Sequence, residues 1–263
     1  MKRGTDLGLT TFSSSPRPRI RIVALQTSLH SKPPAVGALL PQAGALSVLK
    51  WLALVAMTLD HVNTYLLGSR PELYVIGRLA FPLFGCVFGF KIGRPPPGKP
   101  VGLQRRTVLM LLIAAGAAQL PYSYLHGGGA WPLNVMVLFL VALCAAWWLR
   151  RGHTRLEAIA GWLIVVVGGA LAEFFWFGLA VVLAARAFAR RPSTFTLSLL
   201  VASIASLQIV NGNALALASL PIVFGAGLLA AAQLPVPTTR EFFYTYYPAH
   251  LAVIAALVFF RGF

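Results

Sequence analysis

Six polar side chains lie in stretches that are otherwise strongly apolar, and five of them are of types that move protons in enzymes. The six are Asp60, His61, Arg78, Glu173, Tyr247 and His250. Histidine and carboxylate groups are the usual general acids and bases, and tyrosine and histidine can donate a hydrogen bond to a developing oxyanion. An ionisable group inside a lipid bilayer costs about 2.5–3.5 kcal/mol on insertion scales, so each of these residues needs a partner or a function.

Asp60 and His61 are neighbours in the chain and therefore point about 100° apart on a helix. We do not expect them to pair with each other. Positions 60 and 78 are equally far from position 69, inside the turn-forming string Gly68-Ser69-Arg70-Pro71. In an antiparallel helical hairpin Asp60 would therefore meet Arg78, and the two charges would compensate each other. Such a pair could serve the chemistry or only lock two helices together.

The remaining candidates stand beside aromatic residues. Glu173 is followed by Phe174-Phe175-Trp176-Phe177 and is either an interfacial residue or a carboxylate in an aromatic cavity that handles protons. Pro248 lies inside the last apolar run, where a proline frees a backbone carbonyl one turn earlier and opens a polar gap. We expect Tyr247 or His250 to donate to an oxyanion there. The other interpretation is an aromatic belt with a packed histidine.

The composition indicates an integral membrane protein. Apolar residues make up 58% of the chain and charged residues 11%, whereas soluble domains carry about a quarter charged residues. Six carboxylates are too few to hydrate a soluble body of 263 residues. The net charge of +16 comes from Lys and Arg in short gaps between apolar runs, which is typical of loops that set orientation and contact anionic lipid. This distribution argues against nucleic-acid binding.

The apolar runs predict an all-α, polytopic bundle of about nine transmembrane helices, within a range of eight to ten. The runs are 46–67, 73–92, 103–125, 131–149, 156–170, 171–189, 194–211, 214–233 and 242–260. A hairpin at Gly168-Gly169 is expected, because it places basic residues in every second gap. The N-terminus is then cytoplasmic and the C-terminus external. Residues 1–45 are expected to form a disordered basic cytoplasmic tail, and residues 46–263 the membrane domain.

The sequence offers no metal site. The five histidines are scattered, and Cys86 and Cys144 lie inside apolar runs without ligand spacing. We expect the two cysteines to be small buried hydrophobes.

Three motifs in order resemble the TraX family, which takes its name from the conjugal-transfer protein that acetylates pilin at its N-terminus. They are Leu49-Lys50-x6-Met57-x2-Asp60-His61, Gly77-Arg78-x-Ala80-Phe81-Pro82, and Phe243-Tyr244-x-Tyr246-Tyr247-Pro248-x-His250-Leu251. The Met-x-x-Asp-His string is also similar to the first helix of the wider transmembrane acyltransferase group, which includes lysosomal heparan glucosaminide acetyltransferase. One departure is Glu173-Phe174, where the family is expected to have Asp-Tyr.

The resemblance implies a TraX-like acyltransferase domain in the bacterial inner membrane. It would move an acetyl group from cytoplasmic acetyl-CoA to an amine or hydroxyl of an acceptor protein, glycan or small molecule at the outer side, with a pilin N-terminus as one candidate. Arg94, Arg105 and Arg106 are candidates for binding the CoA phosphates. His61 would act as the general base or would itself carry the acetyl group.

Two other functional classes stay open on the sequence. Buried Asp, Arg, Glu and His residues in broken helices also describe a proton-coupled secondary transporter, although no internal repeat is visible. A purely structural membrane subunit is the third class. It predicts that the polar residues point at partner helices without converging on one cavity.

Overall fold

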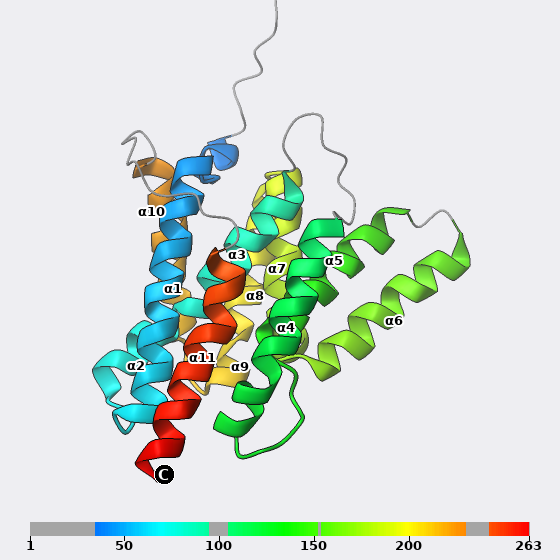
Figure 1. The fold of residues 1–263 in the computed structure, drawn as a ribbon. Helices are drawn as coiled ribbons and strands as arrows, with labels where there is room; N and C mark the ends of the chain where they lie inside the picture. The colour runs from blue at the N-terminus through cyan, green and yellow to red at the C-terminus, as the bar shows by residue number, and fades with distance from the viewer. Residues whose placement is uncertain (1–34, 95–104, 152–153, 230–241, 263) are drawn as a thin grey trace, which may run out of the picture. The chain divides into compact units, whose positions relative to one another are not determined.

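The protein is helical throughout the part of the chain that the structure describes. The computed structural model describes residues 35–94, 105–151, 154–229 and 242–262, all within the unit Pro33–Phe263 (Figure 1). Within these ranges the β contacts amount to a single isolated bridge between Leu133 and Ala172. The predicted all-α class is confirmed. Residues 1–34 of the predicted tail lie outside the described residues. Residues 35–45 were predicted to be disordered but include a 3₁₀ helix at Ala35–Leu39 and the start of the helix Ala43–Leu66.

Each predicted apolar run corresponds to one helix or to two consecutive ones. The elements are η1 (Ala35–Leu39), α1 (Ala43–Leu66), α2 (Pro71–Gly77), α3 (Ala80–Gly93), α4 (Arg105–Leu125), α5 (Val135–Arg151), α6 (Arg155–Leu171), α7 (Phe175–Arg190), α8 (Thr194–Ser206), α9 (Gln208–Asn211), η2 (Leu215–Ala218), α10 (Ser219–Leu229) and α11 (Phe242–Arg261). The second run is broken at Arg78-Leu79 into α2 and α3. This break bears directly on the site, because it is where Arg78 lies.

Five helical segments in the described ranges are long and apolar enough to cross a membrane. They are Ala43–Leu66, Pro71–Gly93, Arg105–Leu125, Thr194–Asn211 and Phe242–Arg261. The chain is thus a membrane protein, while the count of nine spans and the cytoplasmic N-terminus stay predictions. The helices run alternately up and down, so the start of α1, the end of α3 and the start of α4 share one end of the bundle (Figure 1).

The predicted hairpin at Gly168-Gly169 is wrong by a few residues. α6 runs through both glycines to Leu171, and the turn is made at Ala172 to Phe174 instead. A Cβ on Gly168 would lie 2.5 Å from Val141 Cγ1. The two glycines therefore lie within α6, where they let the side chains of Val141 and Trp176 pack close to the helix backbone, and they do not make the turn. Phe174 turns the chain with a left-handed backbone, at φ 63°.

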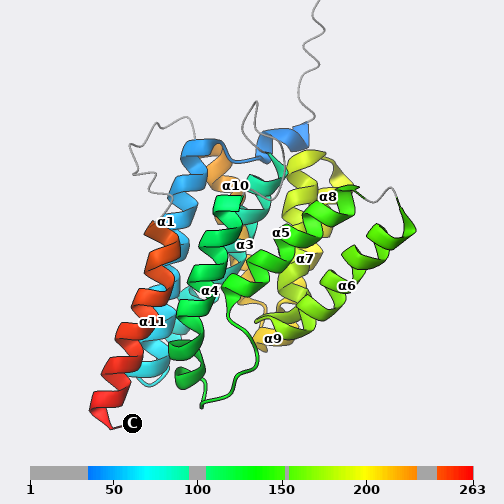
Figure 2. The same cartoon turned by 45° about the vertical axis from the view of Figure 1, so that its right-hand side comes forward.

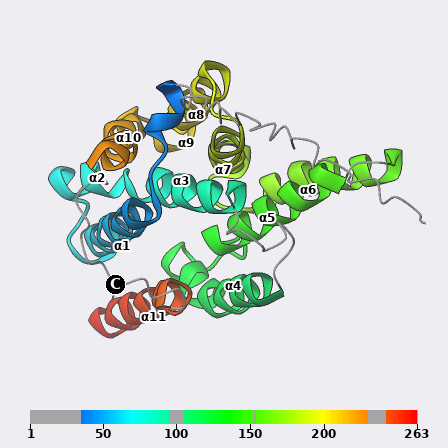
Figure 3. The ribbon, with the colours of Figure 1, turned by 90° about the horizontal axis from the view of Figure 1, so that it is seen from above.

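Five helices form a ring around the site. Each packs on the next in the order α1, α3, α5, α4, α11 and back to α1, as the view from above shows (Figure 3). α11, the last helix in the chain, lies beside α4 (Figure 2). α7 packs along the back of α3, where a Cβ on Gly89 would lie 2.5 Å from the Val182 carbonyl oxygen and 2.6 Å from Ala185 Cβ. Glycine therefore allows the backbones of α3 and α7 to approach closely.

We predict that Gly89→Ala destabilises the protein, because the added methyl group meets backbone atoms of α7. Overpacking of this kind costs about 1–3 kcal/mol, measurable as a lower thermal unfolding midpoint in detergent. Gly116→Ala on α4 is the matched control, since a Cβ there meets nothing within 4 Å. Equal midpoints for the two variants would contradict the close α3–α7 contact.

Candidate active site

A cavity of about 1100 Å³ lies among the five ring helices. Seven of the nine residues predicted for catalysis or donor binding line it: Asp60, His61, Arg78, Arg94, Arg106, Glu173 and Tyr247. His250 and Arg105 do not. The polar residues thus converge on one cavity, which is the reverse of what a purely structural subunit predicts.

The predicted ion pair between Asp60 and Arg78 is confirmed. Arg78 Nη2 donates to both Asp60 carboxylate oxygens, at 2.8 and 2.9 Å, and both side chains are largely buried. The Arg78 guanidinium also lies over the Tyr74 ring, 4.6 Å from its centroid, and Nη1 donates to Asn211 Oδ1 at 3.3 Å. The charge is therefore held from α1, α2 and α9 at once.

Gly77 makes room for this pair. A Cβ at position 77 would overlap with the Asp60 carboxylate, so only glycine lets the end of α2 come so close to α1. Gly77-Arg78 is part of the second sequence motif, and the position of the Asp60 carboxylate is the steric reason for its glycine. The absence of a side chain at position 77 is therefore what allows Arg78 to pair with Asp60.

The polar network around Arg78 also includes Tyr74 and Asn211, which were not predicted as site residues. The Tyr74 hydroxyl donates to the Asn211 carbonyl at 3.3 Å, and Asn213 Nδ2 donates to the Tyr74 hydroxyl at 3.1 Å. In the sequence, Asn211-Gly212-Asn213 has the composition of a break between helices. Asn211 lines the cavity, and Gly212 has the left-handed backbone, at φ 68°, that ends α9 beneath it.

His61 is in contact with His250 from α11. The His61 Nδ1 and His250 Nε2 atoms are 2.7 Å apart, and the two rings are nearly parallel with centroids 5.0 Å apart. The other nitrogen of His250, Nδ1, lies 3.0 Å from the Tyr246 carbonyl oxygen. His250 therefore stands behind His61, with both nitrogens engaged. This placement argues against the predicted role of His250 as an oxyanion donor.

Glu173 lies in the turn between α6 and α7 and faces the N-terminus of α5. Its backbone N–H donates to the Leu133 carbonyl at 2.7 Å, which fixes the turn against the residues before α5. The N–H of Val135, the first residue of α5, donates to the Glu173 carboxylate and also faces the Tyr247 hydroxyl. A helix N-terminus favours a negative charge at this place.

Asn134 holds this part of the site together. Its Nδ2 donates to Gln119 Oε1 at 2.8 Å and to the Ala115 carbonyl at 2.9 Å, and its Oδ1 accepts from Met136 N at 3.1 Å. Asn134 and Gln119 therefore hydrogen-bond the residues before α5 to α4.

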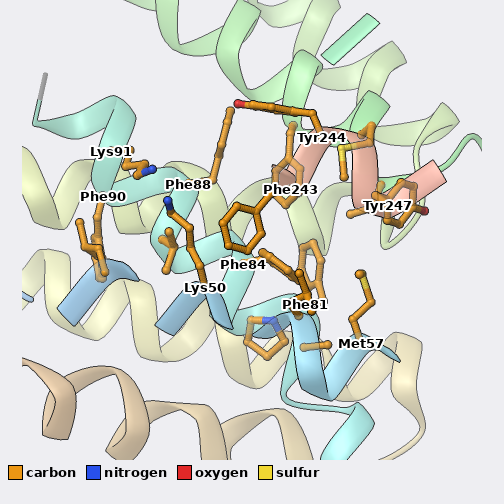
Figure 4. Close-up of a pocket in the computed structure, with 18 of the residues that line it drawn as sticks. Lys50, Met57, Phe81, Phe84, Phe88, Phe90, Lys91, Phe243, Tyr244 and Tyr247 are labelled. Carbon is orange, nitrogen blue, oxygen red and sulfur yellow. The ribbon is translucent and has the colours of Figure 1, made fainter. Parts of the chain in front are cut away.

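The opposite end of the cavity is cationic. Lys50, Lys91, Arg94 and Arg106 line it, and the carboxylates on the cavity wall, Asp60 and Glu173, are both at the other end. Lys50 and Lys91 point to the same end, with Phe84, Phe81 and Phe243 between them and Met57 (Figure 4). A lysine near the end of an apolar helix commonly extends to the membrane edge. The Lys50 Nζ instead lies 5.0 Å from the centre of the Phe243 ring, and Lys50 lines the cavity.

The cavity therefore joins two chemically different ends. Lys50 and His61 are on the same helix, eleven positions apart, which corresponds to about 16 Å along the axis. Aromatic side chains line the wall between them, among them Phe81, Phe84 and Phe243. Within the described residues no three His, Cys, Asp or Glu side chains are placed to hold a metal ion. An elongated molecule with an anionic end and a small reactive end would match this arrangement.

We predict that Asp60→Ala costs about 3–5 kcal/mol of stability, because it leaves the Arg78 charge buried without its partner. The double variant Asp60→Ala/Arg78→Ala is expected to unfold at a higher temperature than Asp60→Ala alone. Glu72→Ala, which removes an exposed acid of the same hairpin, is the control and should change stability by less than about 0.5 kcal/mol. Additive effects of the two substitutions in thermal unfolding would contradict a coupled pair.

Comparison with known proteins agrees with the motifs. The family model described as TraX protein matches residues 45–258. Protein TraX of Escherichia coli is 30% identical over 226 residues, covering 81% of this chain and 87% of the relative. Protein TraX of Escherichia coli strain K12 is 29% identical over 227 residues, with the same coverage. No solved structure matches the chain. The chain belongs to the TraX family.

Proposed function

We propose that this protein is a membrane-embedded acetyltransferase that moves an acetyl group from cytoplasmic acetyl-CoA to an amine or hydroxyl acceptor at the outer side of the bacterial inner membrane. The observation that carries the proposal is the single cavity with His61 at one end and four cationic side chains at the other. In the family's namesake activity the acceptor is a pilin N-terminus, which is the first acceptor to test.

The cationic end suits the phosphates of the donor. Lys50, Lys91, Arg94 and Arg106 surround it, and charge-assisted hydrogen bonds to phosphate are among the strongest in proteins. The pantetheine arm would then extend along the aromatic wall and place the thioester beside His61. Arg105, although adjacent to Arg106, does not line the cavity, so we assign it no part in donor binding.

Transfer of the acetyl group needs one base, and the proton that the acceptor loses ends on the CoA thiol. The acceptor nitrogen or oxygen attacks the thioester carbonyl, and the new N–C or O–C bond forms while His61 takes the acceptor's proton. The C–S bond then breaks, and the thiolate of CoA leaves and receives that proton from His61. The products are the acetylated acceptor and CoA thiol.

The other polar residues support this step. Tyr247 lines the cavity beside Glu173 and is the donor we assign to the oxyanion. The Asp60–Arg78 pair holds α1 against α2 and α9, which fixes the backbone that carries His61. Glu173, held at the N-terminus of α5, faces the acceptor end and can orient or deprotonate the incoming amine.

We predict that His61→Ala lowers the rate of acetyl transfer by about 10²–10⁴-fold, which is the range that a positioned general base contributes. The measurement is the release of CoA thiol, together with the appearance of acetylated acceptor, from purified protein in detergent or vesicles. His126→Ala is the matched control, because His126 is exposed and does not line the cavity.

Two results would refute this assignment. One is full activity of His61→Ala protein that is extracted and elutes like the wild type. The other is pH-gradient-driven solute uptake into vesicles, without any CoA-dependent acetylated product. That second outcome would favour the proton-coupled transporter.

We further predict that Arg106→Ala raises KM for acetyl-CoA by about 10- to 150-fold, because a hydrogen bond to a charged group is worth about 1.5–3 kcal/mol. kcat should change little, since the contact is far from the thioester. Arg105→Ala provides the control and should leave both constants unchanged. Equal effects of the two substitutions on KM would place the donor phosphates outside the cavity.

A further inference from the structure

The contacts of His250 fix which nitrogen of His61 carries a proton. His250 Nδ1 lies 3.0 Å from the Tyr246 carbonyl oxygen, and a carbonyl can only accept, so the proton is on Nδ1. A neutral imidazole has one N–H, which makes His250 Nε2 an acceptor. The proton in the 2.7 Å contact between the rings therefore belongs to His61 Nδ1. Nε2 of His61 then has a free lone pair.

We infer that His250 is a positioning residue that holds His61 in the Nδ1–H tautomer, so that Nε2 is the atom that takes the acceptor's proton. His61 lines the cavity and His250 does not, so His250 acts only through His61. The chemical consequence rests on the acetyltransferase proposed above. The protonation pattern itself does not.

The orientation of both rings is set by packing. Tyr246 and His250 are one helical turn apart on α11, and their rings stack with centroids 5.2 Å apart and planes within 10°. The Tyr246 hydroxyl is fixed to Thr58 Oγ1 on α1 at 2.8 Å. Turning the His250 ring over would place carbon atoms opposite both the Tyr246 carbonyl and His61 Nδ1. Both hydrogen bonds would be lost.

The neutral pair is also the form that burial favours. His250 is 7% exposed, and in the described ranges neither histidine has a carboxylate within ion-pair distance. A buried cation without a counter-ion is costly. A charged His250 would instead donate from Nε2 to His61 Nδ1. The proton of neutral His61 would then be on its Nε2, and this atom could not act as a base.

Nitrogen NMR of protein labelled with ¹⁵N-histidine tests the protonation pattern without any assay of activity. The five histidines give few signals, and His61→Ala and His250→Gln proteins assign the two of interest. We expect a protonated, pyrrole-type Nδ1 and a bare, pyridine-type Nε2 in both rings. A pyridine-type Nδ1 with a protonated Nε2 at His61 would overturn the inference.

Two variants of His250 test whether the protonation pattern of the two histidines matters for acetyl transfer. His250→Gln keeps an acceptor, the amide oxygen, near the place of Nε2, whereas His250→Leu removes it. We expect Leu to lower kcat on the order of 10²-fold with KM for acetyl-CoA unchanged, and Gln to restore most of it. Full activity of the Leu variant would also overturn the inference. Wild-type protein that shows the expected NMR pattern but transfers no acetyl group would overturn the proposed function and leave the tautomer assignment intact.

Discussion

The ion pair between Asp60 and Arg78 is the interaction on which the site depends. It places two charges inside apolar helices, where each would be costly alone, and so it forces α1 and the break between α2 and α3 into one register. Gly77 removes the side chain that would stand in the way. His61, one residue after Asp60, is thereby directed into the cavity beside α11.

The cavity among the ring helices has two chemically different ends. In the proposed function, protons are transferred where α1, α11 and the turn before α7 meet, and the donor phosphates bind where α3 ends and α4 begins. The wall between the two ends is lined largely by aromatic side chains, among them Phe81, Phe84 and Phe243. A donor whose negative charge and reactive group lie at opposite ends of the molecule would contact both ends of the cavity.

Much of this arrangement could be predicted from the sequence. The apolar runs gave the helices, because a membrane requires the length of each one, and hairpin symmetry gave the Asp60–Arg78 pair. The contact between His61 and His250 could not be predicted, since it depends on how α1 and α11 pack, far apart in the chain. Nor could the inward direction of Lys50, because a basic residue near a helix end equally suits the lipid interface. The glycines at 168 and 169 suggested a turn but serve close packing instead.

The most direct test is an experimental structure of the full chain with a non-hydrolysable acetyl-CoA analogue, in which a thioether replaces the thioester. We predict its phosphates among Lys50, Lys91, Arg94 and Arg106, and its acetyl-bearing carbon in contact with His61 Nε2. A ligand that binds outside the cavity, or with its phosphates at the His61 end, would contradict the account.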